Sequence, residues 1–485
     1  MFNKFGKSKE IVVILSALGG FIFGYNTGVI TGALPHIAKE YDMNTVQQGL
    51  VVCSVLLGAL IGSVSGGLLA NIWGRKPILI LTAITTIVGG IGIAAIPPIA
   101  VVCCVRIILG LGVGASSSVC PLMVAEVIPI EKRGKYGSVF QVFITIGLLM
   151  GNVMGVILLK ADHNWRWMFG AGAAPGIIML PFALIVKESP IFLQQQVLKK
   201  QTKVLTVNAN NNDEDINNNN NMIKKRRIFK KPKGLELLRM KKNRKPMFTG
   251  VVLAVFSQLT GINAFIYFSS VIFEFAGFTG TYGPITCSCI LQFWNVLTTL
   301  GAMYTVDVVG RRILLFTGSI VMTICNFLIA IFFVALSGKV QGWLSIIALF
   351  LFIAAFEFSI GTLFWFVINE ILDDDVKNIG APIINALQWL FNLLLSFLFL
   401  SAVKYLGRST MFWVFGGIGL VCIILLWILL PPEKGKIQMD ISRDDLSDSQ
   451  LSDSQIPKLS EIEDNVEILQ QDNDIQDLIV PNPQE

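Results

Sequence analysis

The sequence contains twelve apolar segments of about twenty residues each, and this repetition limits what the chain can fold into. Their centres lie near residues 22, 58, 86, 112, 148, 175, 260, 294, 323, 356, 391 and 420. An α-helix of about twenty apolar residues crosses the ~30 Å hydrocarbon layer of a membrane. Only 14% of the residues are charged, against roughly 25% in soluble proteins. The sequence therefore predicts an all-α membrane protein with twelve transmembrane helices.

Lysine and arginine are concentrated in alternate loops between these segments. They occur in the N-terminal stretch, at Arg75 and Lys76, in residues 132–135, in the long central loop and at Arg311 and Arg312. Helices that cross in alternating directions place all these loops on one side, and loops rich in Lys and Arg face the cytoplasm. We therefore expect both termini to be cytoplasmic, in a protein of the plasma membrane.

The segments fall into two groups of six, separated by a polar stretch and followed by a polar tail. We predict an N-terminal six-helix bundle, a cytoplasmic helical linker with an Asn-rich insertion, a C-terminal six-helix bundle and a disordered acidic tail, over residues 1–186, 187–245, 246–436 and 437–485. The linker contains a basic run, Lys224–Lys233, which in a soluble protein could bind nucleic acid. Beside twelve spans we interpret it as an anchor near anionic lipid, and we expect no nucleic-acid partner.

Residue patterns that carry enzyme chemistry are missing from the sequence. It contains neither a phosphate-binding P-loop nor a nucleophile elbow. His36 and His163 are the only histidines, and the eight cysteines show no zinc-binding spacing. We therefore expect no enzymatic activity, no metal and no cofactor.

The two groups of six segments share a pattern of charges. A Gly-Arg-Lys or Gly-Arg-Arg motif follows the second and the eighth segment, and a glutamate precedes a cation by seven residues at the ends of the fourth and the tenth. Matched charges indicate two related bundles. We expect ion pairs between the halves to hold an inner gate shut; charges that only set orientation would explain the arginines but not the glutamates. The predicted gating residues are Arg75, Glu126, Arg133, Arg311, Arg312, Glu370 and Lys377.

A series of motifs occurs in the order typical of one family. It comprises GFIFGYNTGVITG (20–32), GRK (74–76), VAEVIPIEKRGK (124–135), KESPIFL (187–193), SQLTGINAFIYFSS (257–270), VDVVGRR (306–312), NE (369–370) and PPEKGK (431–436). On these motifs, residues 10–436 or so resemble the sugar porter family of the major facilitator superfamily. The resemblance implies the major facilitator fold, with two six-helix bundles, and transport by alternating access.

The resemblance also implies a sugar bound near the middle of the membrane, largely by the second bundle. Amides donate to and accept from hydroxyl groups, and aromatic rings cover the apolar face of a sugar. Each amide could instead join two helices, as polar residues in membrane helices often do. The residues that match the family's substrate contacts are Gln141, Gln258, Asn263, Tyr267, Asn295, Trp365, Gln388 and Trp389.

The chain departs from the family pattern at several points. Ser257 stands where many members have a glutamine, and Ile191 replaces an arginine. The tenth helix lacks the usual prolines, so we expect Gly361 to permit its bending. In the seventh segment, Thr260 and Gly261 mark a weak point at which we expect the helix to be interrupted.

The first-helix motif favours transport without proton coupling. Asn26 occupies the coupling position, where proton-coupled members carry an aspartate, and an amide cannot take up a proton. Glu357 is the other embedded carboxylate to consider, and the family pattern places it toward the cytoplasmic end. We therefore expect facilitated diffusion of a monosaccharide, a glucose-like hexose, by a uniporter. Proton–sugar symport, transport of a polyol and a sugar sensor that does not transport are the alternatives.

Overall fold

The computed structural model describes residues 2–95, 98–129, 133–194, 196–197, 240–267, 273 and 283–430, and every regular element within them is helical. The first half of the chain forms α1 (Phe2–Glu40), α2 (Thr45–Trp73), α3 (Arg75–Ala95), α4 (Ile99–Val127), α5 (Arg133–Ile157), α6 (Asn164–Gly170), the 3₁₀ turn η2 (Ala171–Ala173) and α7 (Ala174–Ile185). The second half forms α11 (Lys241–Leu259), α12 (Ile262–Tyr267), α14 (Gly283–Val309), α15 (Arg311–Ala335), α16 (Gly338–Phe356), the π turn η5 (Glu357–Gly361), α17 (Thr362–Ile371), α18 (Asp374–Leu406) and α19 (Arg408–Leu429).

Twelve stretches of these described helices are long and apolar enough to cross a membrane. The sixth, seventh and tenth stretches each combine more than one element. Large apolar side chains are exposed on outer faces, such as Ile91 of α3 and Trp427 of α19, which are 55% and 65% exposed. Exposure on this scale suits lipid rather than water. The prediction of an all-α integral membrane protein with twelve spans is confirmed.

α1 and α5 pack so closely that their backbones touch. α1 carries a glycine at every fourth residue from Gly20 to Gly32, and each of them faces α5. A Cβ atom at Gly28 would lie 2.6 Å from the carbonyl oxygen of Leu148. Rows of small residues permit this close approach between membrane helices. The contact fixes two helices of the first half against each other.

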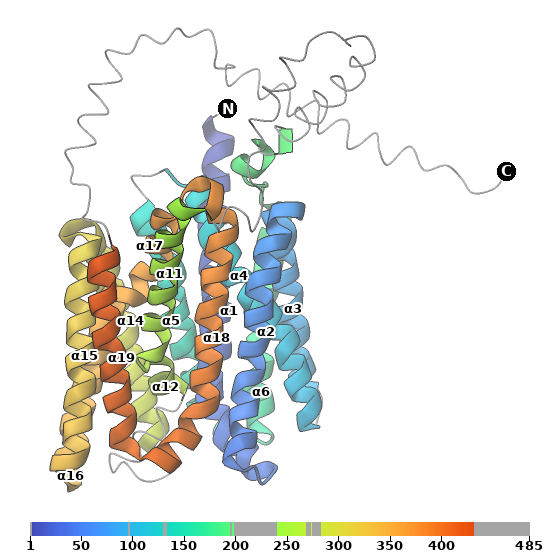
Figure 1. Ribbon diagram of the computed structural model, residues 1–485. Helices are drawn as coiled ribbons and strands as arrows, with labels where there is room; N and C mark the ends of the chain where they lie inside the picture. The colour runs from blue at the N-terminus through green and yellow to red at the C-terminus, as the bar shows by residue number, and fades with distance from the viewer. Residues whose placement is uncertain are drawn as a thin grey trace, which may run out of the picture. The chain divides into compact units, whose positions relative to one another are not determined.

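The two halves of the chain meet where α2 packs along α18 and α5 packs along α14. In Figure 1, α18 (orange) lies beside α2 (blue). Gly67 contacts Pro382, whereas Gly49 contacts Phe397, so α2 and α18 run in opposite directions. This pairing places Arg75, which follows α2, at the same end as Asp373, which precedes α18. We call this end, where α3, α11, α15 and α18 begin, the basic end.

The seventh span is interrupted between α11 and α12, as the sequence predicts. α11 ends at Leu259, and Gly261 adopts φ +103°, a conformation that favours glycine. The Asn326 side chain on α15 donates a hydrogen bond to the Thr260 carbonyl oxygen at 3.1 Å. A backbone carbonyl released by the interruption therefore has a partner within the bundle.

The tenth span bends at the π turn η5, which joins α16 to α17. Ser359 has non-helical angles there, with φ −122° and ψ −108°. The hydroxyl of Thr362 donates to the carbonyl oxygen of Glu357 at 2.7 Å and so satisfies a group that the distorted turn leaves open. The sequence indicates bending at Gly361; the structure places the kink two residues earlier, because a π turn rather than a single glycine produces it.

Most of the predicted linker and the whole of the predicted acidic tail lie outside the described residues. The same holds for the Asn-rich insertion and the basic run. The division into four parts therefore stays a prediction.

Candidate functional site

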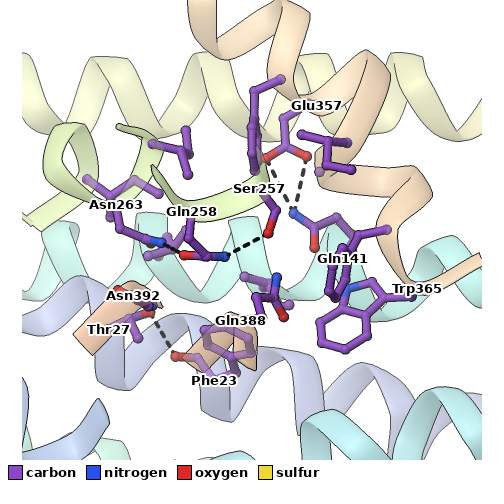
Figure 2. A pocket seen from close by; sticks show the side chains of 18 of the residues that line it. Phe23, Thr27, Gln141, Ser257, Gln258, Asn263, Glu357, Trp365, Gln388 and Asn392 are labelled. Carbon is purple, nitrogen blue, oxygen red and sulfur yellow. Dashed lines mark hydrogen bonds between the residues drawn. The ribbon is translucent and has the colours of Figure 1, made fainter. Parts of the chain in front are cut away.

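A central cavity lies between the two halves of the chain, and polar side chains from both halves line it (Figure 2). None of the described residues that line it is Lys, Arg or His. Its lining is therefore mainly neutral hydrogen-bonding groups and aromatic rings, with one carboxyl group. The polar and tryptophan lining residues are Thr27, Gln141, Ser257, Gln258, Asn263, Glu357, Trp365, Gln388, Trp389 and Asn392.

Two amides face each other across the interruption of the seventh span. Gln258 belongs to α11 and Asn263 to α12, and the Asn263 side-chain nitrogen donates to the Gln258 side-chain oxygen. Gln258 in turn lies 3.4 Å from the Ser257 hydroxyl (Figure 2). A continuous helix would turn positions five residues apart by about 500°, onto different sides. The interruption therefore brings both amides to one cavity.

A hydrogen bond between Gln141 and Glu357 crosses the cavity from one half to the other (Figure 2). The Gln141 amide of α5 lies 3.2 Å and 3.4 Å from the two carboxylate oxygens of Glu357 in η5. Glu357 is only 1% exposed. In the tenth stretch, Gly338–Trp365, Glu357 lies nearer to Trp365 than to Gly338, toward the basic end, and η5 places it in the cavity wall. The expectation that this end is the cytoplasmic one stays a prediction.

Aromatic rings from the two halves meet at the cavity. Trp365 of α17 packs edge-on against Phe140 of α5, with ring centroids 5.6 Å apart. Trp389 of α18 lies 4.8 Å from the ring of Phe23 on α1. These rings provide flat apolar surfaces beside the amides, a combination suited to a ligand with one apolar and one polar face.

Six of the eight predicted substrate contacts line the cavity, and the other two need separate comment. The Tyr267 side chain lies outside the described residues. Asn295 on α14 is fully buried and does not line the cavity; its side chain donates to Gln292 at 3.2 Å. It lies one helical turn from Thr299, which contacts Glu357. Asn295 therefore lies one turn beyond the cavity wall, and its role as a substrate contact stays a prediction.

Two polar lining residues were not predicted from the sequence. Thr27 follows the coupling position on α1, and Asn392 follows Gln388 by four residues on α18. Residues four apart share a helix face. That spacing is a signal from which Asn392 could have been found once Gln388 was chosen.

Asn26 at the coupling position does not line the cavity. It is 2% exposed, and its side-chain nitrogen donates to the carbonyl oxygen of Ile22 one turn earlier at 2.8 Å. The amide is thus bound to its own helix.

The predicted gating charges gather at the basic end but form pairs within each half. The Arg75 guanidinium holds the Glu126 carboxylate through two bonds of 3.0 and 2.5 Å, both on first-half helices. Arg311 pairs with Glu370, both on second-half helices. These two pairs each lie within one half, because each arginine begins a helix beside the end of a helix of its own half. The expectation of ion pairs between the halves stays a prediction.

The other predicted gating residues take different positions. Arg312 lies over the rings of Phe316 and Trp427, 5.7 and 5.6 Å from their centroids. Lys377 lines a second cavity, on the basic-end side of Trp365. The Arg133 side chain lies outside the described residues. A gating role for this group stays a prediction.

Hydrogen bonds join the halves on both sides of the central cavity. On its basic-end side, the Asn385 amide of α18 donates to the hydroxyls of Ser117 and Ser118 on α4 at 2.9 and 2.8 Å. We call this group the Asn385 latch. On the opposite side, the Thr31 hydroxyl of α1 donates to the Ile266 carbonyl oxygen of α12 at 3.1 Å. Hydrogen bonds thus connect the two halves on the basic-end side of the cavity and on the opposite side.

Comparison with known proteins relates the chain to transporters. The family described as "Sugar (and other) transporter" matches residues 12–444. The D-xylose transporter of Levilactobacillus brevis is 31% identical, over 87% of this chain and 92% of that protein. The galactose-proton symporter of Escherichia coli K12 is 32% identical, over 89% and 94%. The glucose transporter GlcP of Staphylococcus epidermidis is 31% identical, over 88% and 95%. Among solved structures, the proton:xylose symporter XylE bound to 6-bromo-6-deoxy-D-glucose matches with a TM-score of 0.72 and 25% identity, over 88% of this chain and 96% of that chain.

Proposed function

Because this chain belongs to the sugar (and other) transporter family, we propose that it carries a glucose-like hexose by facilitated diffusion through alternating access. That it is a sugar transporter, and not an enzyme, follows from the family. The observation that carries the finer proposal is the composition of the central cavity, where Gln141, Gln258, Asn263 and Gln388 surround a space walled by Trp365 and Trp389.

The amides suit a neutral ligand with several hydroxyl groups. Each hydroxyl can both donate to and accept from an amide, and each neutral hydrogen bond contributes on the order of 1 kcal/mol. Three of these four amides bond to protein groups in the structure, since Asn263 donates to Gln258 and Gln141 donates to Glu357. A sugar hydroxyl replaces each of these contacts without leaving a buried group unpaired.

The absence of a titratable group at the coupling position supports a uniporter. Asn26 cannot exchange a proton, and its nitrogen is bonded to the Ile22 carbonyl oxygen. One observation favours proton–sugar symport as a second candidate: Glu357 places a carboxyl group in the cavity wall, where it could exchange a proton between the two sides. The related galactose-proton symporter is consistent with that candidate.

We also propose that the basic end faces the cytoplasm of a cell whose plasma membrane contains the protein. The lysines and arginines at this end, among them Arg75, Arg311 and Lys242, support that orientation.

Uptake into proteoliposomes tests both candidates. D-glucose, D-galactose and D-xylose are supplied outside, with and without an inward proton gradient. We expect the internal sugar to reach the external concentration and no more, with no effect of a protonophore. Accumulation that a protonophore abolishes would establish symport instead, and Glu357→Gln would then be expected to remove accumulation. No uptake of any of the sugars would contradict transport of a monosaccharide.

A further inference from the structure

A row of buried polar residues runs along one face of α14. Ser288, Gln292, Asn295 and Thr299 follow one another at spacings of four, three and four, which places them on one face of the helix. All four are fully buried. α14 packs against α5 of the other half and against η5, so this helix lies where the two halves meet. Thr299 contacts Glu357 in the cavity wall, and the row leads from there away from the basic end.

Within this row, Gln292 and Asn295 form a pair with unused hydrogen-bonding groups. The Asn295 nitrogen donates to the Gln292 oxygen at 3.2 Å. The Gln292 nitrogen and the Asn295 oxygen have no partner in the part of the chain that the structure describes. A buried polar atom without a partner is destabilising. Among the described residues, the pair thus leaves one donor group and one acceptor without a partner, and a further molecule could satisfy both.

The usual structural role of an amide in a membrane helix does not account for Gln292. Such an amide joins its helix to a neighbour through a hydrogen bond. The one bond recorded for Gln292 in the described region is to Asn295 on its own helix, and its nitrogen is left over. An apolar residue would fill the same volume without that cost. The amide therefore suits a ligand better than it suits packing.

From these contacts we propose that Gln292, with Asn295, forms an outer sugar subsite, in which the Gln292 nitrogen donates to a hydroxyl of the monosaccharide before the sugar reaches the central cavity. The proposal rests on the proposed function. Neighbouring sugar hydroxyls offer one acceptor and one donor, which complement the unused nitrogen of Gln292 and the unused oxygen of Asn295. The subsite is covered in this structure, and sugar would reach it in the state that opens away from the basic end.

Substitution of Gln292 by Met tests the subsite, because methionine keeps the length of the side chain and removes both polar groups. The measurement is KM for uptake of whichever of D-glucose, D-galactose and D-xylose the wild-type protein carries best, together with its monodeoxy derivatives. We expect Gln292→Met to raise KM about fivefold for the full sugar. For the derivative that lacks the contacted hydroxyl, the wild-type protein should show the raised KM already, and Gln292→Met should add nothing.

Two controls separate a direct contact from an indirect effect. Ser345→Ala removes a buried hydroxyl of α16 that also has no partner among the described residues, and it should leave KM unchanged. On an Asn295→Ala background, Gln292→Met should still raise KM, because Gln292 contacts the sugar itself. No further rise on that background, or an equal rise for every deoxy derivative, would overturn the proposal. Failure of the wild-type protein to carry any of the sugars would instead overturn the proposed function.

Discussion

The Gln258 and Asn263 amides bond to each other, and a sugar bound in the cavity as proposed would replace this bond. At the scale of single residues, recognition therefore depends on the exchange of one hydrogen bond for another. The net gain from each exchange is small, on the order of 1 kcal/mol. Affinity for sugar should accordingly be moderate and spread over several residues.

Removal of one amide from this pair should weaken sugar binding without affecting folding. We expect Gln258→Ala to raise KM for sugar uptake about fivefold at normal surface expression, since one neutral hydrogen bond is lost. Thr317→Ala serves as a control, because that hydroxyl on α15 is exposed and bonds to carbonyl oxygens of its own helix. Unchanged KM in Gln258→Ala would place the sugar elsewhere.

Residue types were easier to predict from the sequence than directions of side chains. Gln141, Gln258 and Gln388 line the cavity as expected, since motif positions identify them. The positions of Glu357 and Asn295 relative to the cavity were not predicted, because they depend on a π turn and on the rotation of α14. No short motif encodes either feature.

Of the three described membrane-spanning stretches that deviate from a continuous α-helix, the seventh and the tenth do so at the cavity. At the scale of elements, the interruption after Leu259 depends on Gly261, and the bend in the tenth span depends on η5. The first was predicted because glycine weakens a helix. The second was predicted only in part, since a π turn needs no characteristic residue.

A side chain at Gly261 should destabilise the interruption. Its φ of +103° is unfavourable for an L-residue, and a Cβ there would lie 2.7 Å from the Phe415 ring. We expect Gly261→Ala to lower the free energy of unfolding by about 1–2 kcal/mol, measured by thermal unfolding in detergent. Gly417→Ala on α19, where a Cβ would meet no atom within 4 Å, should have little effect. Equal unfolding temperatures would contradict this role of Gly261.

Removal of the Asn385 latch should favour the state that is open toward the basic end. Its two hydrogen bonds join α18 to α4 and must break when that side opens. Ala381 lines the second cavity, so a cysteine placed there by Ala381→Cys, with the native cysteines removed, reports access from the basic end. We expect Asn385→Ala to increase the rate at which maleimide labels that cysteine. Addition of Ser118→Ala should then have little further effect, because the bond of Ser118 to Asn385 is already lost. Labelling at the wild-type rate would mean that the latch does not restrain opening.

The ion pairs within the two halves differ in burial at the basic end, although the sequence suggests matched charges. At the scale of the whole molecule, Arg75 is completely buried and binds both Glu126 and, through its backbone nitrogen, Glu188. The Arg311 side chain is 29% exposed. A buried charge without a partner is far more costly than an exposed one.

Loss of the two arginines should therefore have unequal effects on stability. We expect Arg75→Ala to lower the free energy of unfolding by about 3–5 kcal/mol, because it leaves the buried Glu126 without its partner. Arg311→Ala should cost about 1 kcal/mol or less. Thermal unfolding of both variants in detergent provides the comparison. Equal losses in the two variants would mean that both ion pairs stabilise the folded protein to the same extent.

The number of spans could be predicted from the sequence, whereas their inward faces could not. Hydropathy depends on composition, and twelve apolar segments are visible by inspection. The inward faces cannot be identified from the sequence because lipid and the protein interior are both apolar. On α3, for example, Ile91 is exposed and Ile93 is buried, although both are isoleucines.

The bend in the tenth span at the π turn Glu357–Gly361 depends on how many residues the turn contains rather than on which residues they are. A π turn holds one residue more per turn than the α-helix on either side. The extra residue is absorbed within one turn, so loss of a single codon in this segment would restore a continuous α-helix and leave the residues beyond it, Trp365 among them, on nearly their present faces. The same loss elsewhere between Gly338 and Trp365 would rotate everything beyond it by about 100° and take Trp365 out of the cavity wall. A deletion of one residue is thus better tolerated inside this turn than in the regular helix on either side of it.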